Sequence, residues 1–555
     1  MQISDQWLPE SIRCLRNYNQ RTFTADLLAG LTVGLVALPL AMAFGIASGV
    51  SPQSGLYTAV IAGGIVSLLG GSRTQIGGPT GAFVVIVAGI VAKFGIGGLA
   101  LVTIMAGAIL IVMGLTGLGS AVKFIPRPVT MGFTNGIALL IASTQIKDFL
   151  GLRVASVPSA FLPRMSVLWQ NLGTIYWPAV TVSVVTLAFI LLWPRITRRV
   201  PGSIIAMFLA TAAVALFKLP IETIGSKFGG LPTGFPKFSI PAFQASHIVP
   251  LIPSAVTVAL LGAVESLLSA VVADGMTGKK HNSNVELVAQ GIANIASPLF
   301  GGIPATGAIA RTATNVRSGA KTPVSGFIHA LTLLFILLVA APLAKFVPLA
   351  TLAAVLFIVA YNMGEWHEIP HILRLAKADI AVWAATFFLT VVADLTVAVE
   401  VGIVLAALLY IYRIAQTTTV ELVTADYIKA GQAHILQDKE VPAHVAILRI
   451  HGPFLFGTTD KLDEATADLD SLPPIVVLRL RNMTALDATG IHALEEFSRR
   501  LKRSGRTLLI CGARNQPAQL IARTNFADQI GRENICPHVQ AAIERARQLA
   551  PANAA

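Results

Sequence analysis

The chain has 555 residues, of which 54% are hydrophobic and only 12% are charged, and its formal net charge is +13. A water-soluble globular protein is not this apolar along its whole length, so the composition excludes one and indicates a polytopic α-helical membrane protein. The positive charge does not call for nucleic acid as a partner, because Lys and Arg on the cytoplasmic side of a membrane protein give the same balance.

Residues 1–24 are polar and lack the apolar core of a signal peptide, which predicts a cytoplasmic N-terminus. Residues 25–415 carry the apolar segments of a transmembrane domain in contact with membrane lipid. The expected spans are 25–49, 52–71, 97–118, 125–148, 174–194, 203–217, 250–275, 284–299, 323–341, 345–362, 379–393 and 396–415.

Two shorter half-spans are expected to begin near Thr80 and Ala308, which brings the total to about fourteen. The total divides into two repeats of seven, one at about 25–217 and the other at about 250–415. An odd number of spans in each repeat inserts the second repeat upside down relative to the first. Loops on the side of the N-terminus hold most of the basic residues, so both ends of the chain are expected in the cytoplasm.

The half-spans follow similar interruptions, since residues 77–82 read GGPTGA and residues 301–308 read GGIPATGA. Gly and Pro end one helix, and the next helix begins with free N–H groups and a partial positive charge. Interruptions at matching places in two halves are typical of a transporter's binding site at the centre of the membrane. Arg311, about one turn into the second half-span, makes this a candidate anion site. The alternative is a re-entrant turn whose Arg extends toward the membrane surface.

Other candidate residues lie on long apolar helices. Glu265 is a single carboxylate in an apolar stretch, and we expect it to couple transport to protons or sodium, with Ser269 one turn further on the same face. Its alternative role is a structural partner for a Ser, an Arg or backbone N–H groups. Ala41 and Phe44 follow Pro39 on the first span and are candidates for the cavity wall, with ordinary helix packing as the alternative.

The composition changes after the last span. Residues 416–439 are a predicted polar linker, and residues 440–550 read as a small α/β domain. Its predicted strands are 445–450, 475–480 and 507–511, and its predicted helices lie near 459–470, 489–503, 516–524 and 539–549. Thr489 stands at a predicted helix start, where a phosphate would be well placed, or where Asp487 or Thr489 simply caps the helix.

An enzyme is not expected, because the sequence has neither a nucleophile–base pairing nor a nucleotide-binding motif. Cys14, Cys511 and Cys536 lie far apart and fit no metal spacing, so neither a metal nor a cofactor is expected.

These residues together resemble the sulfate permease (SulP) family of anion transporters. The most specific stretch contains Glu265–Ser269, residues 274–278 (DGMTG), residues 290–294 (QGIAN) and the segment of Arg311. The C-terminal part resembles a STAS domain, with residues 487–490 (DATG) matching the loop in which soluble relatives often carry a phosphorylated Ser at the position of Thr489.

The resemblance implies core and gate domains, a homodimer, and an elevator-like movement of the core in a bacterial inner membrane. It implies substrate contacts from Thr80, Gly81, Ala82, Phe83, Gly307, Ala308, Ile309 and Ala310, with Arg311 nearby. It also places Glu265 at the family's acidic, ion-coupling position, and it leaves room for a cytoplasmic partner at the STAS domain.

Two positions depart from the family pattern, Leu40 where relatives often have Gln and Ala310 where they often have Ser. The chain looks closest to the bacterial branch that imports four-carbon dicarboxylates, so we expect proton-coupled uptake of succinate or fumarate. Bicarbonate or sulfate transport, coupled to protons or sodium or running as exchange, is the alternative.

A nucleobase carrier of the same fold is disfavoured, because a neutral base needs no Arg311. A membrane-tethered anion sensor that signals through the STAS domain is the alternative of another class.

Overall fold

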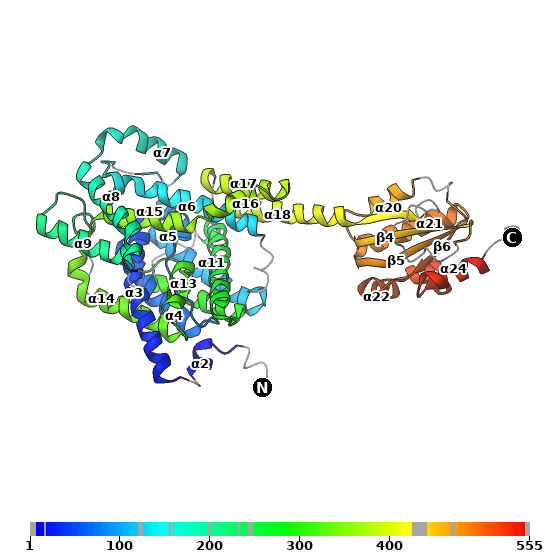
Figure 1. Cartoon of the computed structure of the whole chain (residues 1–555), viewed down its shortest axis with the longest axis horizontal. Coiled ribbons are helices and arrows are strands. Elements are labelled where there is room, and N and C mark those ends of the chain that lie inside the picture. Colours follow the sequence, from blue (N-terminus) through cyan, green and yellow to red (C-terminus); the bar gives the residue numbers. More distant parts are fainter. Residues whose placement is uncertain are drawn as a thin grey trace. The chain divides into compact units, whose positions relative to one another are not determined.

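The computed structural model describes residues 7–15, 18–119, 126–154, 157–158, 160–197, 201–230, 234–241, 248–393, 395–423, 441–467 and 472–549. The chain divides into two compact units, Met1–Val404 and Leu405–Ala555 (Figure 1). This boundary falls inside helix α18 (Leu395–Thr417), a little before residue 415, where the sequence predicted the end of the transmembrane domain.

The first unit is helical. Its described α-helices are α2 (Glu10–Leu15), α3 (Gln20–Ala47), α4 (Pro52–Leu69), α5 (Gly81–Leu115), α6 (Arg127–Leu150), α7 (Phe161–Gln170), α8 (Trp177–Leu192), α9 (Gly202–Phe217), α10 (Ile224–Phe228), α11 (Ile248–Thr277), α12 (Ser283–Leu299), α13 (Ile309–Arg317), α14 (Val324–Ala344), α15 (Leu349–Met363), α16 (Ile369–Ile372), α17 (Lys377–Val392) and the first part of α18.

The number of membrane crossings depends on several short helices. Among the described residues, eight helices are long and apolar enough to cross a membrane, and α9 is a shorter apolar helix. Other predicted spans are shorter still, since α12 has 17 residues, α17 has 16 and α13 has 9. The total of about fourteen crossings therefore stays a prediction.

Helix α5 joins a predicted half-span to the predicted span that follows it. It begins at Gly81 and runs to Leu115, but Gly95 has a φ of 68°, outside the helical range. Glycine reaches this positive φ without the penalty that a side chain would cause. The break divides α5 into two helical parts, close to the division that the sequence predicted.

The helices of the first unit form two sets. In one set, α5 packs on α11 and α12, and α3 packs on α4 and α14. In the other set, α6 packs on α15 and α17, and α15 packs on α8. Figure 1 shows how helices from the first part of the chain, such as α3 and α4, lie among α11, α13 and α14 from its middle. Both halves of the chain thus contribute to each set.

Small residues let α5 and α12 approach each other closely. A Cβ added at Gly291 would lie 2.5 Å from the carbonyl oxygen of Gly107, and one added at Gly107 would lie 2.6 Å from the carbonyl oxygen of Gly291. The hydrophobic effect does not drive helix association inside a membrane. Glycine pairs of this kind favour association because they allow extensive van der Waals contact between the helices.

Gly291→Ala is therefore expected to destabilise the first unit, because the added methyl group forces the two backbones apart. Overpacking of this kind costs about 1–3 kcal/mol. The detergent-solubilised variant should show a clearly lower melting temperature than the native protein. Gly89→Ala in α5 is the matched control, since a Cβ at Gly89 meets no atom within 4 Å. Equal melting temperatures for the two variants would contradict this prediction.

The second unit holds a five-stranded sheet in the order β3-β4-β5-β6-β7, in which β3 is antiparallel to β4 and the other neighbours are parallel. Its strands are β3 (Thr419–Val423), β4 (Val445–Phe454), β5 (Ile475–Leu486), β6 (Thr507–Cys511) and β7 (Ile535–Cys536). Its helices are α20 (Asp460–Ala465), α21 (Ala488–Arg503), α22 (Asn515–Arg523), α23 (Phe526–Ile530) and α24 (Val539–Gln548).

Alternate side chains of each strand reach opposite faces of this sheet. In β4, for example, Leu448 and Ile450 join a cluster with α20 to α23, whereas Val445 and Ile447 join a cluster with α24. Helices therefore cover both faces, as expected for parallel strands that are apolar throughout. The predicted strands and helices of this domain are found, except that α20 ends at Ala465, and residues 468–470 of its predicted range lie outside the described part.

The predicted linker, 416–439, was wrong in its first part. Residues 419–423 form β3, which pairs with β4 from Thr419 opposite His451 to Val423 opposite Ile447. Val420 and Leu422 alternate with polar residues and pack against the main cluster of the sheet, which is the period-2 pattern of an edge strand. This pattern is too short to stand out from the polar residues around it, and residues 424–440 lie outside the described part.

The buried thiol of Cys511 gives a prediction about pH. Burial raises its pKa to about 12, and the neighbouring Cys536 thiol on β7 adds to the increase. A free cysteine has a pKa near 8.5, so unfolded chains lose this proton well before the folded domain does. This group's contribution to stability is therefore complete below about pH 8.5 and is lost as the pH rises toward 12. At pH 8, a maleimide should label Cys511 much more slowly in the folded protein than after denaturation in urea. Equal labelling rates in both states would contradict a buried, protonated thiol.

Candidate anion-binding site

Two very short strands bring the predicted half-spans together. Strand β1 (Gly77–Gly78) pairs antiparallel with β2 (Thr306–Gly307), with Gly77 opposite Gly307 and Gly78 opposite Thr306. Each strand leads directly into a helix, β1 into α5 and β2 into α13. The starts of α5 and α13 therefore lie beside each other, although more than two hundred residues separate them in the sequence.

Among the described residues, no side chain caps the first N–H groups of either helix. Thr80 is the N-cap of α5 and Ala308 is the N-cap of α13, and neither provides a side-chain cap hydrogen bond. The first N–H groups of a helix have no partner inside the helix, and they carry about half a unit of positive charge. Two uncapped N-termini in one place can receive an anion.

Arg311 adds a full positive charge to this place. Its side chain is only 2% exposed, and its Nη2 donates a hydrogen bond to the carbonyl oxygen of Pro79, directly before α5. Its Nη1 is buried and has no hydrogen-bond partner within the part of the chain that the structure describes. A Cβ at Gly78 would lie 2.8 Å from this Nη1, so glycine at that position leaves room for the guanidinium. An unpaired N–H of a buried cation is available to an anion.

Glu265 contacts the start of α5 from helix α11. One oxygen of its carboxylate accepts a hydrogen bond from the Thr80 hydroxyl at 2.8 Å, and the residue is 9% exposed. Over the described residues, Glu265 and Arg311 form no direct ion pair. The carboxylate, the guanidinium and the helix starts thus surround one region without cancelling each other by direct contact.

Ser269 lies one turn after Glu265 on α11, as predicted, and its part in ion coupling stays a prediction. Its hydroxyl donates to Thr312 Oγ1 at 3.0 Å, and the same oxygen accepts the N–H of Ile76 at 3.0 Å. Ser269 therefore holds α11, α13 and the residue before β1 together. The sequence analysis did not identify Thr312, which lies next to Arg311 and is the centre of this arrangement.

The other predicted residues lie either at the starts of α5 and α13 or in the packed interior of the first unit. A Cβ at Gly81 would meet Phe44 Cε1 at 3.4 Å, together with side chains of α6 and α15. Phe83 is buried and approaches Gly262 of α11, and Ala41 packs closely on Gly55 of α4. Both residues are buried, and their contact with substrate stays a prediction. Of the others, Ala82, Gly307 and Ala308 are buried, whereas Ile309 and Ala310 are exposed.

Polar side chains that the sequence analysis did not single out hold the second interruption in place. Asn294 of α12 donates from Nδ2 to the carbonyl oxygen of Ala305 at 2.8 Å, and its Oδ1 accepts the N–H of Ala305 at 2.9 Å. Thr58 of α4 accepts the N–H of Ile303 at 2.7 Å. Asn294 belongs to the QGIAN stretch, so a signal for it was present in the sequence.

Two buried carboxylates hold the loop before β1 and the loop after α13. Glu286 accepts the N–H groups of Gly71 at 2.9 Å and Ser72 at 3.1 Å. Asp26 accepts the N–H groups of Lys321 at 2.7 Å and Thr322 at 3.1 Å. These bonds satisfy buried backbone donors near β1 and after α13, so the two carboxylates are structural partners.

In the second unit, Asp487 is the N-cap of α21. Its Oδ1 accepts the N–H of Gly490 at 2.8 Å, and its Oδ2 accepts the N–H of Phe456 at 3.0 Å. Thr489 is exposed in the first turn of the helix. Asp487 therefore provides the cap, and Thr489 is exposed to solvent two residues further on.

Comparisons with known proteins agree on one family. The sequence profile of the Sulfate permease family matches residues 23–386, and that of the STAS domain matches residues 437–542. The putative sulfate transporter YvdB of Bacillus subtilis is 43% identical, over 94% of this chain and 98% of the relative. The bicarbonate transporter BicA of Picosynechococcus is 31% identical, over 92% of each chain. The solved structure of murine Slc26a9 has the same fold, with a TM-score of 0.86 at 19% identity over 98% of this chain and 95% of that one.

Proposed function

Because the chain belongs to the sulfate permease family of anion transporters and carries a STAS domain, we propose that it binds a small anion between the starts of α5 and α13 and moves it across the membrane. The observation that carries this proposal is the antiparallel pair β1–β2, which joins two helix N-termini beside Arg311. Among the described residues, neither N-terminus has a side-chain cap and the Nη1 of Arg311 has no hydrogen-bond partner.

The charges around the site support coupling to protons. Two helix starts contribute about one positive charge together, and Arg311 contributes a second. If Glu265 is protonated, the site offers about two positive charges and matches a dianion. When Glu265 loses the proton, the match is lost, and the anion is released. We propose that one proton on Glu265 accompanies each dianion, with sodium at this carboxylate as the alternative.

Four-carbon dicarboxylates such as succinate and fumarate are the proposed substrates. They are dianions with an apolar middle, and Ile309 and Ala310 give the start of α13 an apolar character. Sulfate and bicarbonate are the alternatives, because relatives of this chain carry the names of sulfate and bicarbonate transporters.

We propose that substrate crosses by an elevator-like movement of one helix set against the other. Helices α3, α4, α5, α11, α12, α13 and α14 would form the moving core, and α6, α8, α9, α15 and α17 would form the gate. The two-set packing of the first unit supports this assignment, since each set packs mainly on itself. Gly81 stands where the sets meet, facing Ile141 of α6 and Met363 of α15.

We also propose an oligomeric state, a membrane location and a role for the STAS domain. The chain would form a homodimer in a bacterial inner membrane, with both termini in the cytoplasm. The STAS domain would bind a cytoplasmic partner or accept a phosphate at Thr489, where the hydroxyl is exposed.

Uptake into proteoliposomes tests the proposed transport. Labelled succinate, fumarate, sulfate and bicarbonate would be offered separately at two external pH values, with liposomes lacking the protein as the control. We expect uptake of a dicarboxylate that increases at the lower external pH. Uptake of only sulfate or bicarbonate would reassign the substrate. An absence of counterflow for all four anions would instead favour an anion sensor.

A further inference from the structure

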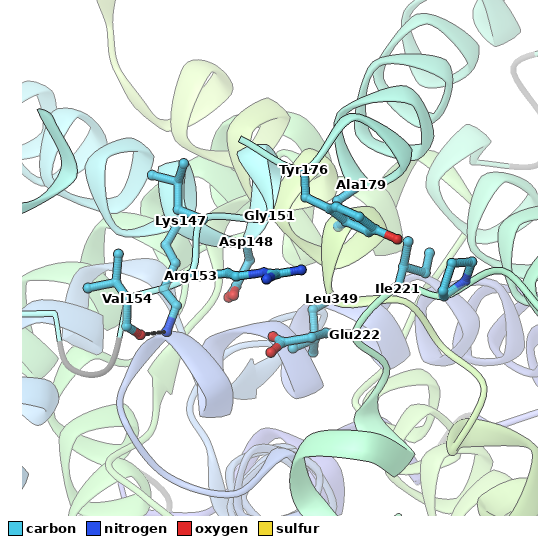
Figure 2. Close-up of a pocket in the computed structure, with 13 residues that line it drawn as sticks. Lys147, Asp148, Gly151, Arg153, Val154, Tyr176, Ala179, Ile221, Glu222 and Leu349 are labelled. Carbon is cyan, nitrogen blue, oxygen red and sulfur yellow. Dashed lines mark hydrogen bonds between the residues drawn. The ribbon is translucent and has the colours of Figure 1, made fainter. Parts of the chain in front are cut away.

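A second site lies apart from the predicted anion site. The first unit has a cavity of about 650 Å³, whose walls come from the end of α6, the residues after it, the start of α8, residues 220–222 and the start of α15 (Figure 2). None of the predicted substrate contacts lines this cavity. Its volume is typical of pockets that hold small molecules.

The walls of this cavity are held by their own contacts. Gly151 has a φ of +63°, and a Cβ there would lie 2.7 Å from the Cβ of Ala179, so glycine lets the end of α6 meet the start of α8. The N–H of Arg153 donates to Thr174 Oγ1 at 3.2 Å. On the opposite wall, the N–H of Leu349 donates to the carbonyl oxygen of Glu222 at 3.0 Å. The cavity is therefore formed before any ligand arrives.

The floor of the cavity is apolar, and its rim is charged. Ala179 and Ala350 line the cavity and belong to a small buried cluster with Val214 and Ile221. The ring of Tyr176 packs against the same cluster. A bound ligand would thus contact apolar side chains at the floor of the cavity and charged side chains at its rim.

Two of the four charged side chains already have partners. Lys147 donates from Nζ to the carbonyl oxygen of Val154 at 2.8 Å, as the dashed line in Figure 2 shows. Asp148 pairs with Lys227, with 3.5 Å between Oδ1 and Nζ. These contacts help to fix the rim and leave Arg153 and Glu222 as the groups that can bind a ligand.

Arg153 and Glu222 are exposed, and neither side chain has a hydrogen bond or ion pair to any described residue. Figure 2 shows both side chains extending into the cavity from opposite walls. The four charged residues of the lining, Lys147, Asp148, Arg153 and Glu222, sum to zero. A neutral sum disfavours a simple anion, because each carboxylate repels it as the cations attract it.

We propose that this cavity binds a small zwitterion, such as an amino acid with a short hydrocarbon chain. Its carboxylate would accept two hydrogen bonds from the planar guanidinium of Arg153, and its ammonium group would pair with Glu222. Its methylene groups would lie on the apolar floor beside Tyr176. This site does not depend on the proposed transport function, since it shares no residue with the anion site.

Binding to the purified full-length protein in nanodiscs tests this proposal by calorimetry. The probes are glycine, β-alanine, 4-aminobutanoate and 6-aminohexanoate, which place the two charges at increasing separations. Butanoate and butylamine each carry one of the two charges and serve as matched probes. We expect at least one zwitterion to bind about tenfold more tightly than either singly charged probe, a difference of about 1.4 kcal/mol.

Variants separate the two predicted contacts. Arg153→Gln and Glu222→Gln should each weaken binding of that zwitterion by about tenfold, whereas Arg195→Gln, an exposed arginine away from the cavity, should not. Both altered side chains are exposed, so the melting temperature should stay unchanged. No zwitterion binding up to about 10 mM, or equal binding of butanoate, would overturn the proposal, as would variants that bind like the native protein.

Discussion

Arg311→Gln is expected to reduce anion uptake strongly without lowering the stability of the protein. The guanidinium is the one full positive charge that the described part of the site provides, and its Nη1 has no partner there. Hydrogen bonds to charged groups contribute about 1.5–3 kcal/mol each, so losing the contact to the anion should reduce uptake by about a hundredfold. A buried cation also costs desolvation energy, and the gain on removing it offsets the loss of the hydrogen bond to the Pro79 carbonyl.

Uptake and melting temperature, measured on the same preparation, distinguish a binding role from a structural one. A residue that mainly supports the fold would lower the melting temperature when it is changed, and Arg311 is expected not to do so. Arg317→Gln is the control, because this arginine is exposed in the last turn of the same helix. Normal uptake by Arg311→Gln, or a large loss of stability, would contradict the assignment of Arg311 to the anion.

Sequence reasoning located the two helix starts but not the contact between them. Repeated Gly and Pro marked the residues before Gly81 and Ile309, because these residue types end helices wherever they occur. The pairing of β1 with β2 involves only two residues on each side, and such short strands show no periodicity. The bond from Arg311 to the Pro79 carbonyl depends on that pairing, so it could not be inferred from either segment alone.

Buried carboxylates in the membrane helices show equally that contacts between distant segments cannot be predicted from either segment alone. Glu265 stands in an apolar stretch and could be recognised as unusual from its neighbours. Glu286 lies in the first turn of α12, where acidic residues are common, and Asp26 lies in the second turn of α3, so nothing local distinguishes them. Their partners are backbone N–H groups more than two hundred residues away along the chain. Only the fold reveals that they are buried.

In the second unit, apolar runs of the central strands were strong enough to predict β4, β5 and β6. The edge strands β3 and β7 were missed, because one is short and half-polar and the other has two residues. The charged cavity of Figure 2 was also beyond the sequence, since its walls come from four separate segments. Lys147 and Asp148 could be read there only as the end of a span.

Glu265→Gln is expected to remove the dependence of uptake on a proton gradient while exchange of substrate continues. Glutamine keeps an oxygen that can accept the Thr80 hydroxyl, so the start of α5 should keep its place. The neutral side chain imitates the protonated carboxylate, which leaves the site with its positive charge and able to bind a dianion. It cannot release a proton, so the gradient no longer drives accumulation.

The measurement compares gradient-driven uptake with counterflow in proteoliposomes at several external pH values. Native uptake should increase as the external pH falls, whereas the Glu265→Gln variant should show flat, low uptake and counterflow within about twofold of the native rate. Glu286→Gln provides the contrast, because Glu286 is also buried but binds the N–H groups of Gly71 and Ser72. It should lower the melting temperature and leave the pH dependence of the remaining uptake unchanged. Full gradient-driven uptake by Glu265→Gln would show that the coupling proton binds elsewhere, and a flat pH profile in Glu286→Gln would move the coupling role to that carboxylate.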